Sequence, residues 1–526
     1  LVACDGGAST DSEDFDVPAI VGEVSGDIFD RQRLIQVTVN MPAGDFEQMR
    51  REGRTLSSIM NSCPDSDFEY TDFTATVNID GEQLDNVAIR KKGFLGSISG
   101  ERPSIKLNFG SHVDDRTFKG MKRMTLNNDR QDPSHSHQCL AYDLYRAAGL
   151  VAPRCNLAKV IINGEDLGIY SQVESVKKPF LELNYGDKSG NLYEAQLADF
   201  GEHLNDVFEL KTNKTLNDRS DLTVLSDLLL NEGLTDEGFV AALGGVIDLP
   251  EFIKFWAMEA LIGHWDSATG NVNNFYIYHD PSDDLFHFIP WGTDGAFTST
   301  NPFKPHSGPL YRNMSIASRL FAISDTQQQY FDAINDLLLK QWNEDDLLAK
   351  LQTVQALSAA PMASYTHMET FISGDEAQGV LSQRALLASA MAGEVVQTTY
   401  LLPDEASTCQ APVLTTLSAI FESKSPYDGG SFTFTNELGV QVTASMDILA
   451  LAPGEIKPDA LVHTLNESTQ PGVVELTLVG AGPAPFYPDS YVLQVFIEAP
   501  SYERPGSHDL IGLATNVMLF KVLDAN

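Results

Sequence analysis

The sequence contains few cysteines, little positive charge and no long apolar run. Five cysteines occur among 526 residues, without a Cys-x-x-Cys pair or a His/Cys cluster, so a zinc site is not indicated. No run of about eighteen apolar residues is present, and we expect no transmembrane helix. Lysine and arginine total 35 against 73 acidic residues, and the formal charge of −38 argues against binding nucleic acid or anionic lipid.

The N-terminal residues resemble the end of a bacterial lipoprotein signal. Small residues precede Cys4, and the Gly/Ser/Thr/Asp-rich segment 6–14 has the composition of a flexible tether. The alternative is a chance Ala-Cys pair. We expect Cys4 to carry lipid, which would anchor the protein to a membrane at the cell envelope, on the periplasmic or outer surface.

The other four cysteines permit disulfides in an exported chain. They are Cys63, Cys139, Cys155 and Cys409. Cys139 and Cys155 flank a predicted helix and its exit. We therefore expect these two to pair, or Cys63 to pair with one of them.

The chain is too long for one hydrophobic core. We predict a tether at 1–28, a main α+β domain at 29–400, a linker at 401–412 and an all-β domain at 413–526. Strand patterns dominate the first part of the main domain, where they indicate a sheet that ends near Gly120. The predicted strands are Leu34 to Asn40, Phe73 to Asp80, Gln83 to Lys91 and Ser104 to Phe109.

Helical spacing of apolar residues dominates from Ser134 to about Tyr400. The predicted helices include His137 to Ala148, Ser220 to Asn231, Asp325 to Gln341, Glu344 to Leu357 and Gly379 to Gly393. Beyond the linker, short strands alternate with Gly/Pro/Asn/Asp turns, which predicts an immunoglobulin-like β-sandwich. Its expected role is binding or spacing, and carbohydrate binding is one possibility.

Two acidic loops carry the strongest chemical signal. Asp266 is followed five residues later by Asn271, the separation found in a kinase catalytic loop. Asp294-Gly295 then stands where a metal-binding Asp-Gly pair would follow. Asp and Asn are also ordinary turn formers, so the spacing alone leaves a structural role open.

The elements around these loops favour the catalytic interpretation. Leu249 to Ile262 reads as a buried helix that begins with Pro250 and delivers its C-terminal end to Asp266. Two strands, Asn274 to Tyr278 and Leu285 to Pro290, then form a hairpin that leads to Asp294. Helix, acidic loop, hairpin and acidic loop is the order of a kinase C-lobe.

Basic residues gather in the first part of a chain that is otherwise acidic. They are Arg90, Lys91, Lys92, Lys106, Lys119, Lys122 and Arg123. Gly93 to Gly100 separates two strands, and such a hairpin lets backbone N–H groups approach phosphates, while Lys106 on the next strand supplies charge. An ordinary surface hairpin is the alternative, but the cluster suggests an anionic ligand.

Several blocks between about Leu34 and Phe297 together resemble the CotH proteins, a family of atypical protein kinases. The resemblance is specific in the order and spacing of its blocks. Besides the acidic loops, they are Val87–Gly93 with Pro103–Phe109, Met124–Asp129 with Asp132–Ser134, Ala147–Arg154, Ile161–Tyr170, Val173–Glu174 and Gly190–Tyr193.

The resemblance implies a two-lobed, kinase-like α+β domain that binds ATP and Mg²⁺ or Mn²⁺. Asp266 would be the catalytic acid that orients or deprotonates the substrate hydroxyl, and Asp294 would bind metal. The second metal ligand is left open between Asn271, which has the catalytic-loop spacing, and Asn274, which matches the family's Asn before a Tyr-rich strand.

The same resemblance implies a set of nucleotide-binding residues. Lys106 would neutralise phosphates, Arg90 and Lys92 would contribute to the same site, and the turn after Lys92, with Ser97 and Ser99, would cover it. Glu174 would lie on the adenine side or pair with a lysine.

Two departures from the family pattern affect the expected site. Relatives often carry two acids in a Pro-Trp-Asp-x-Asp arrangement, whereas this chain has Gly292 in place of the first acid. His137 stands where relatives often have Arg. Taken with the lipoprotein-like N-terminus, the resemblance predicts a Ser/Thr protein kinase at the cell envelope. The alternative is a non-catalytic surface adhesion or scaffold protein on the same fold.

Overall fold

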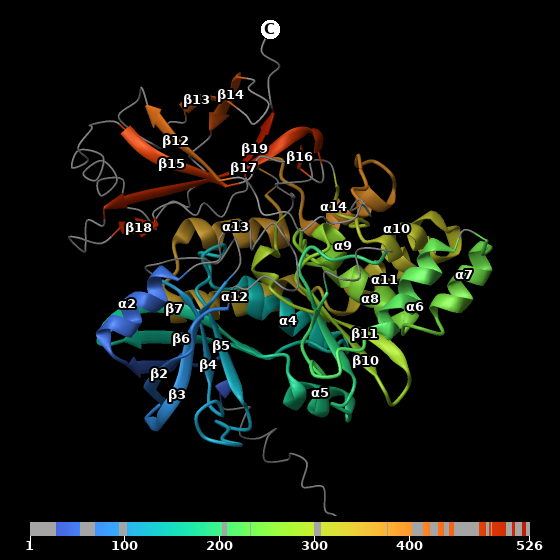
Figure 1. Cartoon of the computed structure of the whole chain (residues 1–526). Coiled ribbons are helices and arrows are strands. Elements are labelled where there is room, and N and C mark those ends of the chain that lie inside the picture. Colours follow the sequence, from blue (N-terminus) through green and yellow to red (C-terminus); the bar gives the residue numbers. More distant parts are fainter. Residues whose placement is uncertain are drawn as a thin grey trace, which may run out of the picture.

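A computed structural model defines the architecture of the chain (Figure 1). It describes residues 28–52, 69–93, 102–201, 208–231, 233–298, 307–375 and 377–401, and beyond these the strands between 414 and 521. Cys4, Cys63, Cys409, Ser97 and Ser99 lie outside the described residues.

The first part of the domain is a closed seven-stranded barrel. Its strands are β1 (Ile35–Asn40), β2 (Phe73–Ile79), β3 (Glu82–Lys92), β4 (Ser104–Asn108), β5 (Arg123–Asn127), β6 (Cys155–Ile162) and β7 (Glu165–Glu174). Neighbours follow the order β1-β2-β3-β4-β5-β7-β6, and β1 closes the barrel by pairing parallel to β6. Closure leaves no unpaired sheet edge, which is the usual weak point of an isolated sheet.

Alternation of side chains explains why these segments form a barrel. Ile35, Val37 and Val39 of β1 are fully buried, and the residues between them are not. The predicted sheet was expected to end near Gly120, and this boundary is wrong. Strands β5, β6 and β7 extend the barrel to Glu174. In the barrel β7 lies between β5 and β6, although in the sequence a helix separates β5 from the two later strands.

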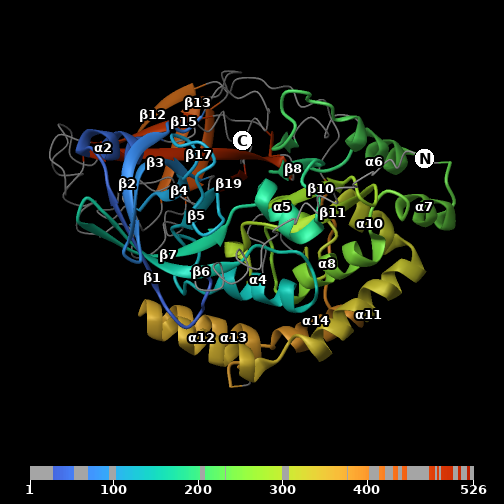
Figure 2. The ribbon, with the colours of Figure 1, turned by 90° about the horizontal axis from the view of Figure 1, so that it is seen from below.

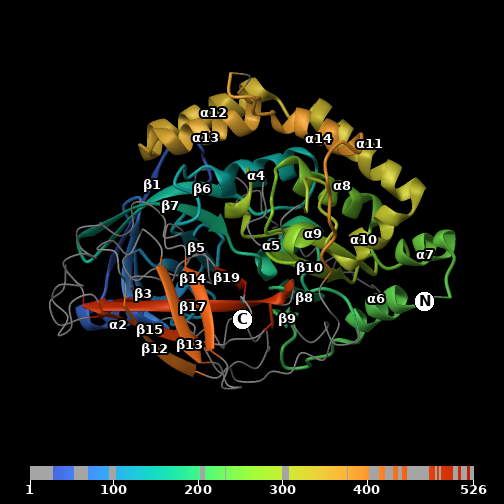
Figure 3. The same cartoon turned by 90° about the horizontal axis from the view of Figure 1, so that it is seen from above.

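The remainder of the domain is mainly helical. Helix α8 lies at its centre, and Trp256 of α8 stacks on Tyr330 with ring centroids 3.7 Å apart. Figures 2 and 3 both show α11 to α14 as a layer along one side of the molecule. The helices are α2 (Ala43–Arg51), α4 (His137–Ala147), α5 (Lys178–Tyr185), α6 (Ser220–Leu230), α7 (Asp236–Leu243), α8 (Leu249–Leu261), α9 (Ala268–Asn271), α10 (Ser315–Ala322), α11 (Ser324–Lys340), α12 (Glu344–Ser358), α13 (Met362–Ser373) and α14 (Gln383–Met391).

A second sheet accompanies these helices. Its order is β11-β10-β8-β9, formed by β8 (Asn191–Ala195), β9 (Glu209–Leu210), β10 (Phe275–Asp280) and β11 (Leu285–Pro290). The predicted hairpin and the predicted helix before it are confirmed. Helix α8 begins at Leu249, where the Asp248 carboxylate caps it by accepting a hydrogen bond from the Glu251 N–H at 3.0 Å.

The C-terminal region contributes strands. They are β12 (Leu414–Ile420), β13 (Gly430–Thr435), β14 (Gln441–Met446), β15 (Val473–Val479), β16 (Pro483–Ala484), β17 (Tyr487–Pro500), β18 (His508–Leu510) and β19 (Met518–Lys521). β17 pairs antiparallel with β15, β16, β18 and β19, and β13 pairs with β14. The immunoglobulin-like sandwich stays a prediction. Within the described residues, no helix has the length and apolarity needed to cross a bilayer.

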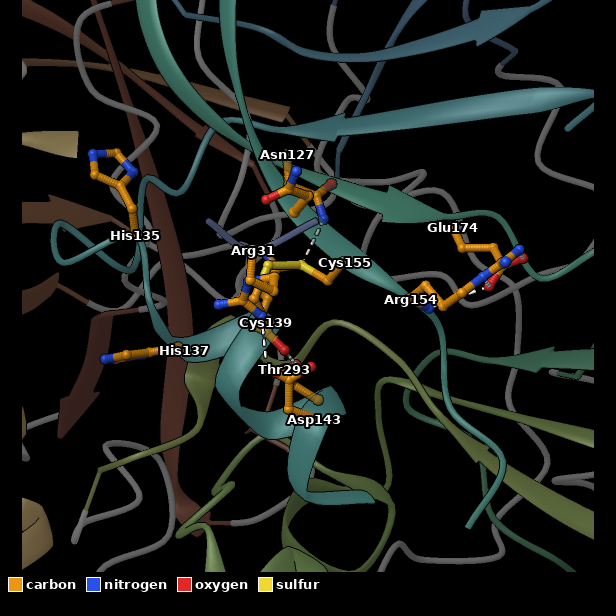
Figure 4. Close-up of a disulfide and its surroundings, with 12 residues drawn as sticks. Arg31, Asn127, His135, His137, Cys139, Asp143, Arg154, Cys155, Glu174 and Thr293 are labelled. Carbon is orange, nitrogen blue, oxygen red and sulfur yellow. Dashed lines mark hydrogen bonds and ion pairs between the residues drawn. A yellow bond between two sulfur atoms is a disulfide. The ribbon is translucent and has the colours of Figure 1, made fainter. Parts of the chain in front are cut away.

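A disulfide joins α4 to the barrel. Cys139 in the first turn of α4 is bonded to Cys155 at the start of β6, and the two Cα atoms are 5.1 Å apart (Figure 4). Both side chains are buried. One of the two predicted pairings is thereby confirmed, and the bond ties the helix to a strand sixteen residues away in sequence.

Removal of this bond should destabilise the domain. In Cys139→Ala/Cys155→Ala, the free energy of unfolding should fall by about 3 kcal/mol, since a loop of roughly this length is no longer closed in the unfolded chain. Denaturant titration with and without a reductant measures the loss. The double variant should be insensitive to the reductant, and an equal reductant effect on it would contradict the assignment.

Candidate functional site

The two acidic loops meet beside each other. Asp266 follows the end of α8, and Asp294 lies in a 3-10 turn, η3 (Thr293–Gly295), after β11. The hairpin β10–β11 returns the chain between them. A Cβ added to Gly295 would lie 3.4 Å from the Cβ of Asp266 and 3.2 Å from Nε1 of Trp265. Gly295 therefore marks the point where the two loops touch.

Three asparagine side chains hold the Asp266 carboxylate. The Nδ2 groups of Asn271, Asn273 and Asn274 donate to it at 2.7, 3.1 and 2.8 Å respectively. Asn274 also donates to the Asp266 carbonyl at 3.0 Å. These donors fix the orientation of the carboxylate. Asn273 was missed by the sequence analysis, although the Asn-Val-Asn-Asn run was a visible signal.

The structure distinguishes the two asparagines proposed as metal ligands. The Oδ1 atom of Asn271 is buried and has no hydrogen-bond partner among the described residues, which is an unsatisfied oxygen suited to a cation. The Oδ1 of Asn274 instead lies against Gly292, only 2.5 Å from the position a Cβ would take there. Asn271 is therefore the better placed of the two.

The environment of Asp294 disfavours its charge. Burial, followed by the neighbouring Asp266 carboxylate, raises the pKa of Asp294 to about 7, while Lys92 acts in the opposite direction. Two carboxylates and an unsatisfied amide oxygen in one place form the donor set that Mg²⁺ and Mn²⁺ prefer. The residues present thus fit a divalent cation.

A basic face of the barrel lies toward these loops. Arg90 pairs with Lys106, and Lys92 pairs with Ser104, across strands β3 and β4. Directly opposed residues share a face, so the three cations lie on one side of the sheet. Lys91 points into the barrel, where its Nζ donates to the Arg50 carbonyl at 2.8 Å. It was counted in the basic cluster from the sequence, and the structure removes it.

Lys92 connects the basic face to the acidic loops. Its Nζ donates to Oδ1 of Asn127 at 2.5 Å and lies 5.7 Å from the centre of the Trp291 ring. Burial lowers the pKa of Lys92 to about 8, and the nearby carboxylate of Asp294 acts to raise it. A phosphate bound at this place would need a positively charged amine such as Lys92 opposite Asp294.

Lys106 is surrounded by further charged residues that the sequence analysis missed. Burial and the charge of Lys177 lower the pKa of Lys106 well below its ordinary value. The nearby Glu194 is itself bound by Lys211 at 2.5 Å, and Lys211 also contacts Glu209 at 2.8 Å. Glu194 directly follows the block Gly190–Tyr193 in the sequence. Local spacing did not indicate which strand the Glu194 side chain would face.

Glu174 does not pair with a lysine. It forms a two-point ion pair with Arg154, whose Nε donates to Oε2 at 2.9 Å (Figure 4). Together with Arg123, Lys177 and Phe180, these residues line a pocket where β7 leads into α5. Of the two roles expected for Glu174, the pairing partner is thus Arg154 and not a lysine, and the adenine-side placement stays a prediction. Arg90, the remaining cation of the basic barrel face, contacts the Asp72 carboxylate at 3.8 Å.

Another group of candidate ligands lies at the tip of the β10–β11 hairpin. Ligand atoms of Asp280, Asp283 and His287 lie within 4.8 Å of one another. Both ring nitrogens of His287 already contact carboxylates, at 3.2 Å to Glu251 and 3.1 Å to Asp283. We interpret this group as an ion-pair cluster.

His264, beside the acidic loop, is buried. Burial lowers the pKa of His264 to about 3, so its ring is neutral.

Comparison with known proteins gives the family. Residues 89–382 match the family described as CotH kinase protein. The chain belongs to the CotH family. Its acidic loops, its basic barrel face and the disulfide-bearing helix all fall within the matched residues.

Three curated relatives illustrate the range of the family. "Inner spore coat protein H" of Bacillus subtilis is 23% identical over 209 residues, which cover 36% of this chain and 57% of that protein. "Invasin CotH2" and "Invasin CotH3" of Rhizopus delemar are 26% and 27% identical, covering 34% and 35% of this chain and 33% and 32% of theirs. The chain thus spans between a third and somewhat over half of the length of these relatives.

One solved structure shows a distant likeness. The Helicobacter pylori proinflammatory kinase CtkA is 11% identical, and the alignment covers 58% of this chain and 95% of that chain with a TM-score of 0.29. A superposition this loose does not establish a shared fold.

Gly292 should tolerate no side chain. Its φ is +51°, which L residues adopt at a cost of about 1–2 kcal/mol, and a Cβ would also displace Asn274 from Asp266. Gly292→Ala should therefore lower the melting temperature more than Gly149→Ala. Gly149 also has a positive φ, of +77°, but nothing lies within 4 Å of its added Cβ. Equal losses in thermal unfolding would show that Asn274 moves aside freely.

Proposed function

We propose that this CotH-family chain binds ATP with Mg²⁺ or Mn²⁺ and transfers the γ-phosphoryl group to a Ser or Thr hydroxyl of a protein substrate. The observation that carries the proposal is the meeting of the Asp266–Asn271 loop with the Asp294 turn, opposite Lys92 of the barrel. Phosphoryl transfer needs a positioned carboxylate, oxygen ligands for a metal and a cation for the phosphates. These three groups converge here from separate parts of the sequence.

Each group has a separate role in this proposal. Asp294 and Asn271 would hold the cation, which when bound screens the phosphate charges and orients the γ-phosphoryl group. Lys92 and Lys106 would bind phosphate oxygens. The substrate hydroxyl oxygen forms the new bond to the γ-phosphorus, the bond from the γ-phosphorus to its bridging oxygen breaks, and ADP leaves. Asp266 would orient that hydroxyl and accept its proton.

The nucleotide would extend from the acidic loops to the pocket beside α5. Lys177 and Arg123 bring further positive charge there, and burial lowers the pKa of Lys177 to about 7. Phe180 and Glu174 also line this pocket, and Phe180 would supply an apolar surface for a base. Burial disfavours the charged form of Lys177 even with Glu194 and Glu209 nearby, and a bound phosphate would offset part of that cost.

The proposed place of action is the cell envelope. A buried disulfide is typical of proteins in oxidising compartments, and Cys139–Cys155 supports export. Anchoring through a lipidated Cys4 remains part of the proposal from the sequence.

A surface binding protein on the same fold is the second candidate. Gly292 removes one of the two acids expected from the family pattern, and the structure leaves no room there for a carboxylate. Three relatives from Rhizopus delemar carry the name invasin. Scarcity of ATP outside the cytoplasm also favours this alternative. In it, the two acidic loops would have lost their affinity for metal.

Asp294→Asn tests the metal site directly. In the wild type, ATP with Mg²⁺ at about 100 times the dissociation constant should stabilise the chain by about 2.7 kcal/mol, and EDTA should remove the metal-dependent part. Asp294→Asn should lose that part without loss of apo stability, because the charged form of this carboxylate is already disfavoured. Asp115→Asn, with a side chain 97% exposed, is the control. Retained metal dependence in Asp294→Asn would overturn this assignment.

Lys106→Met should change stability and binding in opposite directions. Removing a desolvated amine that lies near Lys92, Lys177 and Lys211 relieves repulsion, so the apo melting temperature should rise. Affinity for ATP should fall about tenfold, since a charge-assisted phosphate contact is lost. Lys119→Met, which breaks a contact to Glu82 at 3.2 Å on the barrel surface, should leave ATP affinity unchanged. Reduced stability with unaltered binding would mark Lys106 as structural.

A further inference from the structure

The first turn of α4 contacts the metal-site turn. Nδ1 of His137 lies 2.8 Å from the carbonyl oxygen of Asp294, and because a carbonyl only accepts, Nδ1 donates. Thr293, next to Asp294, donates through Oγ1 to the Gln138 carbonyl at 3.4 Å. Two successive residues of α4 thus hold two successive residues of the η3 turn.

The same turn of α4 also reaches the phosphate-side lysine. Oε1 of Gln138 accepts a hydrogen bond from Nδ2 of Asn127 at 2.7 Å. Oδ1 of Asn127 in turn accepts from Nζ of Lys92 at 2.5 Å. Because one end of the Asn127 amide binds Gln138, the other end is fixed in the orientation that receives the lysine.

Both helix residues are themselves fixed. His137 and Gln138 are 6% and 1% exposed. Nε2 of His137 lies 3.4 Å from the Asp132 carboxylate, which also accepts from the His137 backbone N–H at 2.7 Å. Nε2 of Gln138 donates to Asp129 at 3.3 Å. The next residue along the helix is Cys139, so the disulfide secures this turn to β6 (Figure 4).

We propose that His137 and Gln138 are positioning residues that assemble the two halves of the site, His137 by holding the Asp294 turn and Gln138 by holding Lys92 through Asn127. The inference depends on the proposed function, because it assigns these residues to the same ATP and metal site. Neither side chain would touch the nucleotide. Replacing a residue that hydrogen-bonds to a metal ligand commonly lowers metal affinity about 10–100-fold.

Two substitutions of His137 separate its two contacts. Asn offers an amide where Nδ1 was, toward Asp294, whereas Gln offers an amide where Nε2 was, toward Asp132. His137→Asn should therefore bind Mg·ATP within a few-fold of the wild type. His137→Gln should lose about tenfold in Mg·ATP affinity, yet its affinity for ATP in EDTA should not change, since Lys92 is still held.

Gln138→Met should show the complementary loss. Met has a similar length but cannot accept from Asn127, so Lys92 loses its fixed position and ATP affinity in EDTA should fall several-fold. Gln383→Met is the matched control, because Gln383 is equally buried, at 2% exposed, and donates to the Ala260 carbonyl at 2.8 Å. This control should lose stability without any change in ATP affinity.

Isothermal titration with ATP in EDTA and with ATP and Mg²⁺ measures both quantities, at a temperature where circular dichroism shows every variant folded. Equal affinities for His137→Asn and His137→Gln, or an unchanged Gln138→Met, would overturn the inference. Absence of any ATP binding by the wild-type chain would instead overturn the proposed function. Should His137→Gln fail to fold, a metal-dependent gain in His137→Asn smaller than in the wild type would still contradict the role assigned to Nδ1.

Discussion

The close approach of Asp266 and Asp294 is the constraint around which the site is organised. Two partly desolvated carboxylates near each other repel, and burial together with this repulsion raises the pKa of Asp294 to about 7. Three asparagine amides hold Asp266, and glycine at position 295 permits the two loops to touch. A divalent metal bound between the two loops would relieve this repulsion.

The barrel face near the acidic loops carries the complementary charge. In a chain with a formal charge of −38, Lys92, Lys106 and Lys177 lie together with their charged forms disfavoured by burial. Carboxylates of the acidic loops and amines of the barrel, which lie near one another, suit a ligand that brings both phosphate and metal. Helix α4 hydrogen-bonds to both the Asp294 turn and Asn127, which holds Lys92, and its disulfide attaches it to the barrel, so the covalent framework and the site share one element.

Membership of the CotH family and the geometry of the two acidic loops are the separate observations behind the proposed catalysis. The family match covers residues 89–382, and this segment contains both acidic loops and the basic face. Gly292 is the feature that weighs toward a binding role, because its backbone conformation and the adjacent Asn274 exclude a second acid. Whether the chain transfers phosphate therefore depends on how well Asp294 and Asn271 hold a cation without that acid.

The sequence by itself determined the local parts of this protein. Spacing was enough for helix α8, the β10–β11 hairpin and the two acidic loops, since each depends on residues close together in the chain. The sequence also named Cys139–Cys155 as one of its alternative disulfides, and the structure chose it. Only the tertiary structure decided that β6 and β7 complete the barrel, that Lys91 points inward, that Glu174 binds Arg154, and that Asn271 rather than Asn274 keeps an unsatisfied oxygen. Strand pairing over long separations and the choice between neighbouring charged partners depend on burial and closure of the whole barrel, which no local pattern encodes.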